Sequence, residues 1–495
     1  MSKFNKPGTN QTTNRCDYPA YFMTRKEELL TAVLTTMFGE PKHYGSTDCD
    51  LISLAIITAS EDPEFLCRLA CYARNVGNMR SVSHVLTAII ARYAHEYTRV
   101  TVRNTVNRPD DITEILSCYL SLFGKPLPNA LKRETAAVIQ SFDEYSLAKY
   151  NNQNKPMKLR DVLRLTHPNP ASKEKEELFR RLLDNNLNTP YTWETELSAK
   201  GNTCEVWNQL IASGKVGYMA LLRNLANILK SGADITPVLK KLSDPQEVKN
   251  SRQLPFRFYS AYRTLKSGNL MTPEVHEALE TALRVSIDNM EHIPGRTLIA
   301  VDCSGSMCDT ISRRGTIRCC DIGTLFGAMA SYICDDPTVC YFDSESCSMF
   351  KGKQKGYLIA RYEKSESILD ICDKNSAAGG NTDLSLPMRY ALKRDPLRET
   401  RPFDRVIYFS DNQCNSFKHG HYGIIANEFA EEYRDRYNSD FWVHGVDMQG
   451  YGTQQFIGPR TNLIAGWGES VLYFIMLAEK GIGTVAKTIS EYPIV

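Results

Sequence analysis

Long hydrophobic runs are missing from this sequence of 495 residues. The longest uninterrupted apolar stretch, Val471–Ala478, spans about eight residues, whereas a membrane-spanning helix needs about 20. We therefore expect no transmembrane segment and no association with a membrane. Residues 1–15 are polar and lack the apolar core of a secretory signal, so we predict a flexible tail over residues 1–20.

Paired metal-binding cysteines are missing as well. Although the sequence has 15 cysteines, it contains no C-x-x-C pair. The closest groupings are Cys67/Cys71, Cys303/Cys308 and Cys319/Cys320. Structural zinc sites usually need tight paired spacings, and an odd number of cysteines cannot all pair in disulfides. We therefore expect buried, reduced thiols in a cytoplasmic protein.

An excess of one charge is also missing from the chain as a whole, which has 59 basic and 57 acidic residues. The balance hides an asymmetry, since residues 1–300 carry 38 basic and 32 acidic side chains and residues 301–495 carry 21 and 25. The first part is net basic, which favours binding of a polyanion there. Hydrophobic residues make up 42% of the chain, enough to build folded cores and to exclude a wholly disordered protein.

Apolar residues recur at three- and four-residue spacings from about Tyr21 to Asn289, a pattern typical of amphipathic helices. The predicted helices are Arg25–Met37, Pro63–Val76, Val82–Tyr97, Thr113–Leu122, Glu134–Ser141, Glu174–Leu183, Glu205–Ala212, Val216–Lys230, Pro255–Lys266 and Pro273–Met290. No strand-like alternation is evident between them. Many helices with short connections predict stacked antiparallel helix pairs, an α-solenoid.

The pattern changes at Ile293–Arg296, after which short apolar runs alternate with helices. The predicted elements are the strands Thr297–Val301, Thr338–Phe342, Arg405–Phe409 and Phe441–Val446, and the helices Asp321–Ile333, Ile424–Asp435 and, as the last element, Gly468–Ala478. This alternation predicts a multidomain chain whose second part is a doubly wound α/β domain, with a mostly parallel sheet covered on both faces. Such sheets bind ligands beyond the carboxyl ends of their strands.

Three groups of oxygen-bearing side chains follow predicted strands or loops of this second part. Asp302, Ser304 and Ser306 form a D-x-S-x-S turn after the first strand. Thr382 and Asp383 lie in the loop GGNTDLSLP, and Asp411 ends the Arg405–Phe409 strand in FSDN. Asp, Ser and Thr oxygens suit a hard divalent cation such as Mg²⁺. A capped turn without metal is the alternative interpretation of the D-x-S-x-S pattern alone.

These motifs resemble the metal-ion-dependent adhesion site of the von Willebrand factor A domain, over residues 296–495. The resemblance implies that Asp302, Ser304, Ser306, Thr382 and Asp411 hold a divalent metal, Mg²⁺ in our expectation. Asn381, between the glycine pair and Thr382, departs from the pattern. We expect this domain to bind a protein carboxylate through the metal, because its acidic surface would repel phosphate.

The first part of the chain has three basic features. Between Phe65 and Arg108 there are seven arginines, no lysine and a single acidic residue, Glu96. The segment KLRDVLRLTHP, if helical, places Arg160, Arg164 and His167 on one stripe and ends at Pro168. Arg223 interrupts the apolar helix LLRNLANIL. Guanidinium groups bind phosphates and stack on bases, but internal ion pairs and a structural histidine remain open alternatives.

Several phrases in order resemble the TROVE domain of the Ro autoantigen family: LAKY, RDVLRLTHPNP, VWNQLI, YMALLRNLANIL and PFRFYSAYRTLKSG. The resemblance places this domain at residues 21–292 and implies a ring of HEAT-like helical repeats closed by the A domain. It also implies that Y-like noncoding RNAs bind a basic outer face, and that single-stranded ends of misfolded noncoding RNAs enter a central hole. His167 and Lys149 match RNA-contacting residues of the family, whereas Arg74 and Arg80 have less secure counterparts.

The sequence therefore predicts a cytoplasmic RNA-binding protein, not an enzyme, that acts in ribonucleoprotein assembly and RNA quality control. We expect a monomer that receives an exoribonuclease or another protein through the A domain. A metal-dependent protein scaffold without RNA is the alternative. A nuclease is disfavoured, because a hydroxyl-rich site with few carboxylates is poor at generating a metal hydroxide.

Overall fold

The computed structural model describes residues 11–13, 19–21, 24–35, 47–311, 316–344, 356–375, 379–393, 401–411, 417–418, 421–422, 424–448, 456, 458, 460–465 and 471–494. The chain divides into two compact units, which we describe separately. The helical unit contains residues 23–40, 46–199 and 481–495. The mixed unit contains residues 1–22, 41–45 and 200–480.

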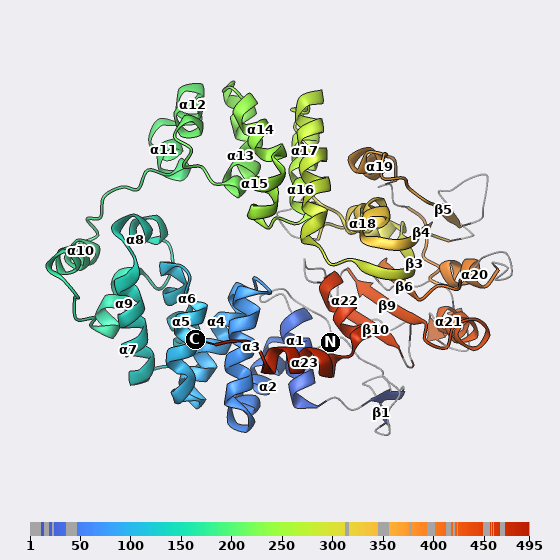
Figure 1. Cartoon of the computed structure of the whole chain (residues 1–495), viewed down its shortest axis with the longest axis horizontal. Helices are drawn as coiled ribbons and strands as arrows, with labels where there is room; N and C mark the ends of the chain where they lie inside the picture. The colour runs from blue at the N-terminus through green and yellow to red at the C-terminus, as the bar shows by residue number, and fades with distance from the viewer. Residues whose placement is uncertain are drawn as a thin grey trace. The chain divides into compact units, whose positions relative to one another are not determined.

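Antiparallel helices joined by short turns build the helical unit (Figure 1). They are α1 Arg25–Thr35, α2 Thr47–Glu61, α3 Pro63–Asn75, α4 Arg80–Tyr93, α5 Thr98–Thr105, α6 Pro109–Phe123, α7 Asn129–Val138, α8 Glu144–Tyr150, α9 Leu159–Thr166, α10 Lys173–Leu183, α11 Trp193–Lys200 and α23 Ile482–Ser490, with 3₁₀ turns at His95–Tyr97 and Ile139–Ser141. Local chemistry sets the ends: Asp62 accepts a hydrogen bond from the Phe65 amide, and Pro63 occupies the first turn of α3. The predicted helical character of this region is confirmed.

Residues 481–495 group with the helical unit, whereas the sequence placed them in the predicted A domain of residues 296–495. The sequence predicted Gly468–Ala478 as the last helix, but α22 Val471–Lys480 is followed by α23. Helix α23 packs against α1 and α3, where Figure 1 draws it in red beside these blue helices. Just beyond it, the Tyr492 ring meets Tyr72 edge to face at 5.6 Å. This aromatic pair, of which Tyr72 is buried and Tyr492 partly exposed, helps to hold residue 492 on α3.

The mixed unit begins with more helices and then forms the α/β domain. The helices are α12 Cys204–Ala212, α13 Tyr218–Ser231, α14 Thr236–Ser243, α15 Pro245–Ser251, α16 Pro255–Ser267 and α17 Pro273–Ser286, with a 3₁₀ turn at Ile287–Asn289. In the predicted tail, β1 Gln11–Thr13 and β2 Pro19–Tyr21 pair as antiparallel strands. The helix starts again follow cap chemistry, since the Thr272 hydroxyl accepts from the Val275 amide before α17.

A six-stranded sheet is the centre of the α/β domain, in the order β10-β9-β6-β3-β4-β5. Its strands are β3 Ile293–Asp302, β4 Cys334–Phe342, β5 Tyr357–Ala360, β6 Arg405–Ser410, β9 Trp442–Asp447 and β10 Thr461–Ala465. The other elements of the domain are α18 Cys319–Ile333, α19 Ile368–Asn375, α20 Leu386–Lys393, α21 Ile424–Arg436, α22, the 3₁₀ turn Gly305–Cys308, and the short pair β7 Phe417–Lys418 and β8 His421–Tyr422. Only β5 pairs antiparallel within the sheet. The predicted mostly parallel, doubly wound sheet is confirmed.

Helices cover the sheet closely on both faces. On one face, α20 and α21 cover a buried cluster that includes Phe403, Tyr408 and Tyr433. On the other, α18 lies so close that a Cβ at Gly323 would sit 2.8 Å from a Val301 methyl. Larger side chains at this glycine would push α18 off β3.

The α/β domain docks on the preceding helices through α19. The carboxylate of Glu280 on α17 accepts hydrogen bonds from the backbone amides of Ile368 and Leu369, at 2.9 and 3.0 Å. It thereby caps the N-terminus of α19 across 88 residues of sequence. At the other end of α19, Asp373 pairs with Lys266 of α16. These contacts explain why the helices of residues 204–286 and the α/β domain form one unit.

Asp111 is the buried charged centre of the helical unit, with no exposed surface. Its carboxylate pairs with Arg74 at 3.1 Å, with Arg80, and with Nε2 of His84 at 3.0 Å. Burial alone would raise its pKa, but hydrogen bonds from His84 and Arg80 outweigh that effect and hold the pKa well below its usual value. The carboxylate therefore links α3, α4 and α6 in its charged form.

Replacing Asp111 by alanine should lower the free energy of unfolding of the helical unit by about 3–5 kcal/mol, because buried cations would lose their partner. Urea denaturation followed by circular dichroism measures this change. Asp110→Ala is the matched control, since Asp110 is partly exposed and pairs with Arg80 and Arg108 at the surface. It should cost about 1 kcal/mol or less. Equal losses in the two variants would contradict the central role of Asp111.

Glu479 of α22 should make the folding stability of the α/β domain depend on pH. Its carboxylate accepts from Nε of Arg405 at 2.6 Å and lies 2.9 Å from Nε2 of His444. Burial raises its pKa, but these hydrogen bonds bring the pKa down to about 2, below the ordinary value of 4.5. Stability from this group is therefore present above about pH 4.5 and lost as the pH falls toward 2. Glu479→Gln should lose about 3 kcal/mol at neutral pH and show a shallower acid dependence in denaturant titrations across that window.

Candidate metal site and nucleic-acid interface

Four aspartates lie at the carboxyl ends of neighbouring parallel strands. Asp302 ends β3 and Asp447 ends β9, while Asp343 follows β4 and Asp411 follows β6. All four are buried. Because these strands run parallel in the order β9-β6-β3-β4, their ends meet at one edge of the sheet.

The D-x-S-x-S turn and the glycine-rich loop lie side by side at this edge. The Gly305 amide donates to the Gly380 carbonyl at 3.1 Å, and the Gly379 amide donates to the Cys303 carbonyl at 2.8 Å. The hydroxyls of Ser304 and Ser306 are 3.3 Å apart.

Ser410 and Thr382 complete the neighbourhood of this turn. The Ser410 hydroxyl donates to Asp302 at 2.6 Å, which joins the β6 end to the turn. Thr382, in the glycine-rich loop, is 4% exposed. The structure thus gathers the five predicted metal ligands at one sheet edge, from three separate segments.

Asp383, the remaining candidate of that loop, has a different role. Its carboxylate accepts hydrogen bonds from the amide and hydroxyl of Ser385, at 3.0 and 2.6 Å, immediately before α20. This is the geometry of a turn that starts a helix. Asp383 therefore positions the loop, and the buried Thr382 is the other candidate oxygen donor of this segment.

Asp302 is a buried carboxylate without a cationic partner among the described residues. The pKa of Asp302 is raised to about 7, chiefly by burial. Hydrogen bonds from Ser410 and Ser304 lower this pKa, and the nearby charge of Asp411 raises it. No group of three His, Cys, Asp or Glu side chains in the described part of the chain could hold a metal without other ligands. Two carboxylates plus serine and threonine hydroxyls nevertheless fit a hard divalent cation, which would supply the missing positive charge.

Sequence reasoning overlooked Asp343 and Asp447. Asp447 ends strand β9, which was predicted to stop one residue earlier, and Asp343 directly follows the predicted strand Thr338–Phe342. The position of each at a strand end was the available signal. Both side chains are buried beside the predicted ligands, and the Asp343 carboxylate accepts a hydrogen bond from the Ser344 amide at 2.6 Å.

On the helical unit, α9 presents the predicted Arg160–His167 segment. Its residues Leu159, Val162 and Leu163 are buried, as the sequence predicted. The helix ends at Thr166, and His167 adopts a left-handed conformation with φ 47° just before Pro168. His167 therefore lies at the helix end rather than inside it, and its ring is exposed.

The predicted basic stripe of α9 is accessible. Arg164 has 61% of its side chain exposed and forms only a 3.8 Å pair with Asp161. Arg160 is half-buried, and its Nε has no hydrogen-bond partner among the described residues. Because this Nε is itself buried, the exposed guanidinium of Arg164 and the exposed His167 are the groups of the stripe that are best placed to bind a phosphate.

Helix α8, which packs on α6 as α9 does, places aromatic rings around Lys149. The exposed Lys149 ammonium lies 5.8 Å from the Tyr145 ring and 5.6 Å from the Tyr150 ring. Tyr145 is 43% exposed. The guanidinium of Arg108, at the start of α6, covers the Tyr150 ring at 4.9 Å. Sequence reasoning named Lys149 but missed these two tyrosines, although EYSLAKY spells out the pattern.

Arg74 and Arg80, predicted to contact RNA, have internal partners. Both pair with Asp111, and Arg74 also donates to the Thr105 carbonyl at 3.1 Å. The side chain of Arg74 is only 12% exposed. We therefore assign these two arginines to the structure of the helical unit, and the interface proposed below omits them.

Acids from outside the basic window neutralise most of its other arginines. Arg68 pairs with Glu64, Arg103 with Glu134 and Arg108 with Asp110. Arg92 and Arg99 are exposed and form no ion pair within the described residues. The expected strong positive charge of residues 65–108 is thus reduced in the fold to a few free cations.

A helical-repeat protein with an α/β domain of the von Willebrand factor A type is the class that this fold and its strand-end site define. Models of the TROVE domain match residues 46–188 and 184–282, and a model described as the Ro60 vWA domain matches residues 296–440. The chain therefore belongs to the TROVE family of Ro proteins.

Individual relatives are similar over parts of the chain. Telomerase protein component 1 of Rattus norvegicus is 26% identical over 49% of this chain and 13% of its own length. RNA-binding protein RO60 of Deinococcus radiodurans is 24% identical over 40% of this chain and 37% of its own length. The alignments therefore span well under two thirds of these curated relatives.

The same fold occurs in a solved structure. The crystal structure of the Deinococcus radiodurans Ro (Rsr) protein matches with a TM-score of 0.68 over 93% of this chain and 100% of that chain, at 16% identity. At this identity the match establishes the fold alone. Within the described residues, no helix is both long and apolar enough to cross a membrane.

Proposed function

We propose that this protein binds RNA through the surface that α8 and α9 form in the helical unit. The observation that carries the proposal is the grouping of exposed cations with exposed rings: Lys149 beside Tyr145, and Arg164 with His167 at the end of α9. Cations would bind phosphates, and the rings would stack on unpaired bases. Membership of the TROVE family, and the RNA-binding activity named for the Deinococcus relative, support the same ligand.

The class of RNA that we propose comes from the resemblance to the Ro family, and the chemistry of this surface supports it. A-form duplexes hide their base edges, so a protein selects such RNAs by shape and by single-stranded loops and ends. Small noncoding Y-like RNAs and frayed ends of misfolded noncoding RNAs have both features. We propose both as ligands of a cytoplasmic, non-catalytic ribonucleoprotein subunit that acts in RNA quality control.

The combined replacement of Arg160, Arg164 and His167 by alanine should abolish binding of a Y-like stem-loop RNA in gel-shift titrations. The variant removes two guanidiniums that would bind phosphate and one ring that would stack on a base. Residual binding should depend less on salt, because each lost phosphate contact lowers the slope of log affinity against log salt by about 0.9. The buried face of α9 is untouched, so the circular dichroism spectrum should not change.

A matched control removes three exposed cations elsewhere: Arg25→Ala, Lys249→Ala and Lys487→Ala. Their side chains are 58%, 50% and 76% exposed. If this control loses as much affinity as the α9 variant, binding is unspecific charge attraction and the proposed interface is wrong. Unchanged affinity in the α9 variant would reject it as well.

We also propose that the sheet edge of the α/β domain holds Mg²⁺ through Asp302, Ser304, Ser306, Thr382 and Asp411. The buried Asp302, which lacks a cationic partner among the described residues, supports this proposal. With so few carboxylates, an oxygen from outside would complete the shell. A carboxylate of a protein partner, such as an exoribonuclease, would suit that position.

Addition of Mg²⁺ should raise the melting temperature of the wild-type protein, since an ion at about 100 times its Kd stabilises by about 2.7 kcal/mol. Asp302→Ala should abolish this increase in differential scanning fluorimetry and leave the gel-shift affinity for RNA unchanged. Asp383→Ala, which removes a neighbouring carboxylate outside the proposed ligand set, should keep the Mg²⁺ response. Full Mg²⁺ binding by Asp302→Ala in calorimetric titration would refute the site.

A further inference from the structure

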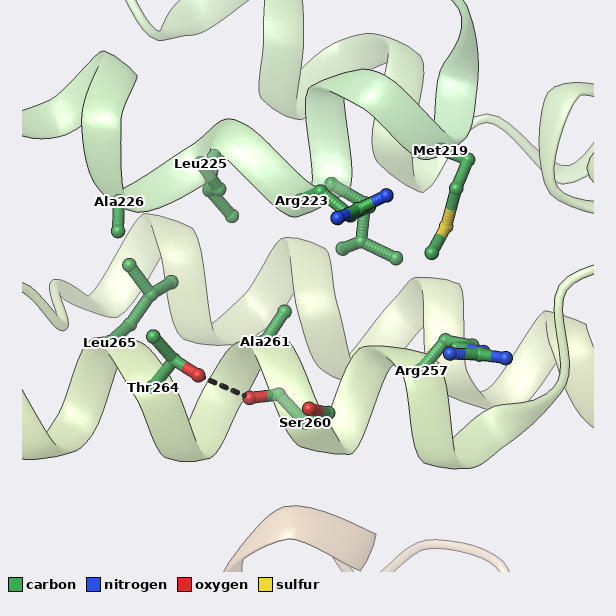
Figure 2. Close-up of a pocket in the computed structure, with 10 residues that line it drawn as sticks. Met219, Arg223, Leu225, Ala226, Arg257, Ser260, Ala261, Thr264 and Leu265 are labelled. Atoms are coloured by element: carbon green, nitrogen blue, oxygen red, sulfur yellow. Dashed lines mark hydrogen bonds between the residues drawn. The ribbon is translucent and has the colours of Figure 1, made fainter. Parts of the chain in front are cut away.

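A groove between α13 and α16 of the mixed unit has a volume of about 440 Å³. Figure 2 shows the two helices running side by side, with Leu225 and Ala226 of α13 pointing toward Ala261 and Leu265 of α16. The two helices carry the phrases YMALLRNLANIL and PFRFYSAYRTLKSG. The groove lies outside both the α8–α9 surface and the sheet edge, and neither proposed activity uses it.

The floor of this groove is aliphatic. Leu222, Leu225 and Leu265 line it and are almost fully buried, and Met219 flanks it at one end. No aromatic ring lines the groove. The walls are polar, since Ser260 and Thr264 line the groove, although the Thr264 hydroxyl donates to the Ser260 carbonyl at 2.9 Å. Such a floor accepts branched aliphatic side chains.

Two guanidiniums give the groove a positive end. Arg223 of α13 and Arg257 of α16 face the groove from opposite helices, toward the end at Met219 (Figure 2). Both side chains are exposed, and Arg223 forms no ion pair within the described residues. No carboxylate lines the groove. The lining thus combines two positive charges with an apolar floor.

We propose that this groove docks an acidic, aliphatic-rich segment of a partner protein. Leucine-like side chains would fill the floor, and carboxylates would bind the two guanidiniums, which match carboxylate geometry bidentately. Single-stranded RNA fits less well, because no aromatic ring lines the groove to add to base stacking on the two guanidiniums. An amphipathic acidic helix lying between two helices is a common form of such recognition.

Fluorescence anisotropy with the full-length chain tests this proposal. The probe is a fluorescein-labelled peptide of about twelve residues, with leucine at helical spacing on one face and glutamate elsewhere. The wild-type protein should bind it saturably. Arg223→Ala with Arg257→Ala should weaken binding roughly tenfold or more, and Arg223→Glu with Arg257→Glu should abolish it.

Three controls separate the proposal from general charge effects. Lys230→Ala with Arg252→Ala removes two exposed cations of the same unit that do not line the groove, and should bind the peptide normally. A peptide with serine in place of leucine should bind poorly. The variant with alanine at Arg160, Arg164 and His167 should retain peptide binding. The peptide-docking proposal can then be rejected without rejecting the RNA-binding proposal, and the reverse.

Two results would overturn the proposal. The first is peptide binding by wild type that is absent or insensitive to the Arg223 and Arg257 variants. The second is a loss of affinity for a single-stranded RNA of the same length, with peptide affinity unchanged, in the double alanine variant. Both outcomes are interpretable only with unchanged circular dichroism spectra, which we expect because both arginines are exposed.

Discussion

A carboxylate taken out of water needs a compensating positive charge, and this requirement organises both units. In the helical unit Asp111 obtains that charge from arginines. In the α/β domain Glu479 obtains it from Arg405, and Asp321 from Arg318. Asp302 alone among these four buried acids has no cationic side chain beside it within the described residues. The same physical rule therefore accounts for three carboxylates as structural, and it is the reason why we propose Asp302 as a metal ligand.

The fold was largely predictable because periodicity is a local property of the sequence. The buried face of α9 and the strands ending at Asp302 and Ser410 followed from spacing alone. Helix α23 was not predicted, because its docking on α1 and α3 depends on contacts between opposite ends of the chain. Edge strand β5 was also missed, since it is short and only partly buried and so lacks a clear apolar run.

The candidate sites could be predicted only where a local sequence pattern, such as the end of a strand, also fixes the position of the side chain. The proposed metal ligands Asp302 and Asp411 follow strand ends, so their convergence could be deduced from a parallel sheet. From the sequence, the arginines of residues 65–108 were expected to be available for RNA. Their acidic partners all lie outside this window: Glu64, Asp110, Asp111 and Glu134. Net charge in a window counts residues, but only the fold decides which of them are neutralised.

What remains after this neutralisation defines the surfaces that can bind ligands. Arg160 and Arg164 keep binding capacity because the single acid near them, Asp161, also accepts the Lys158 amide at the start of α9. Arg223 keeps it because its helix contains no acid at all. The two surfaces differ in what accompanies the charge: tyrosines and a histidine near α8 and α9, aliphatic side chains between α13 and α16. Rings select bases and aliphatic floors select side chains, so a single chain can separate an RNA ligand from a protein ligand without any difference in the sign of its charge.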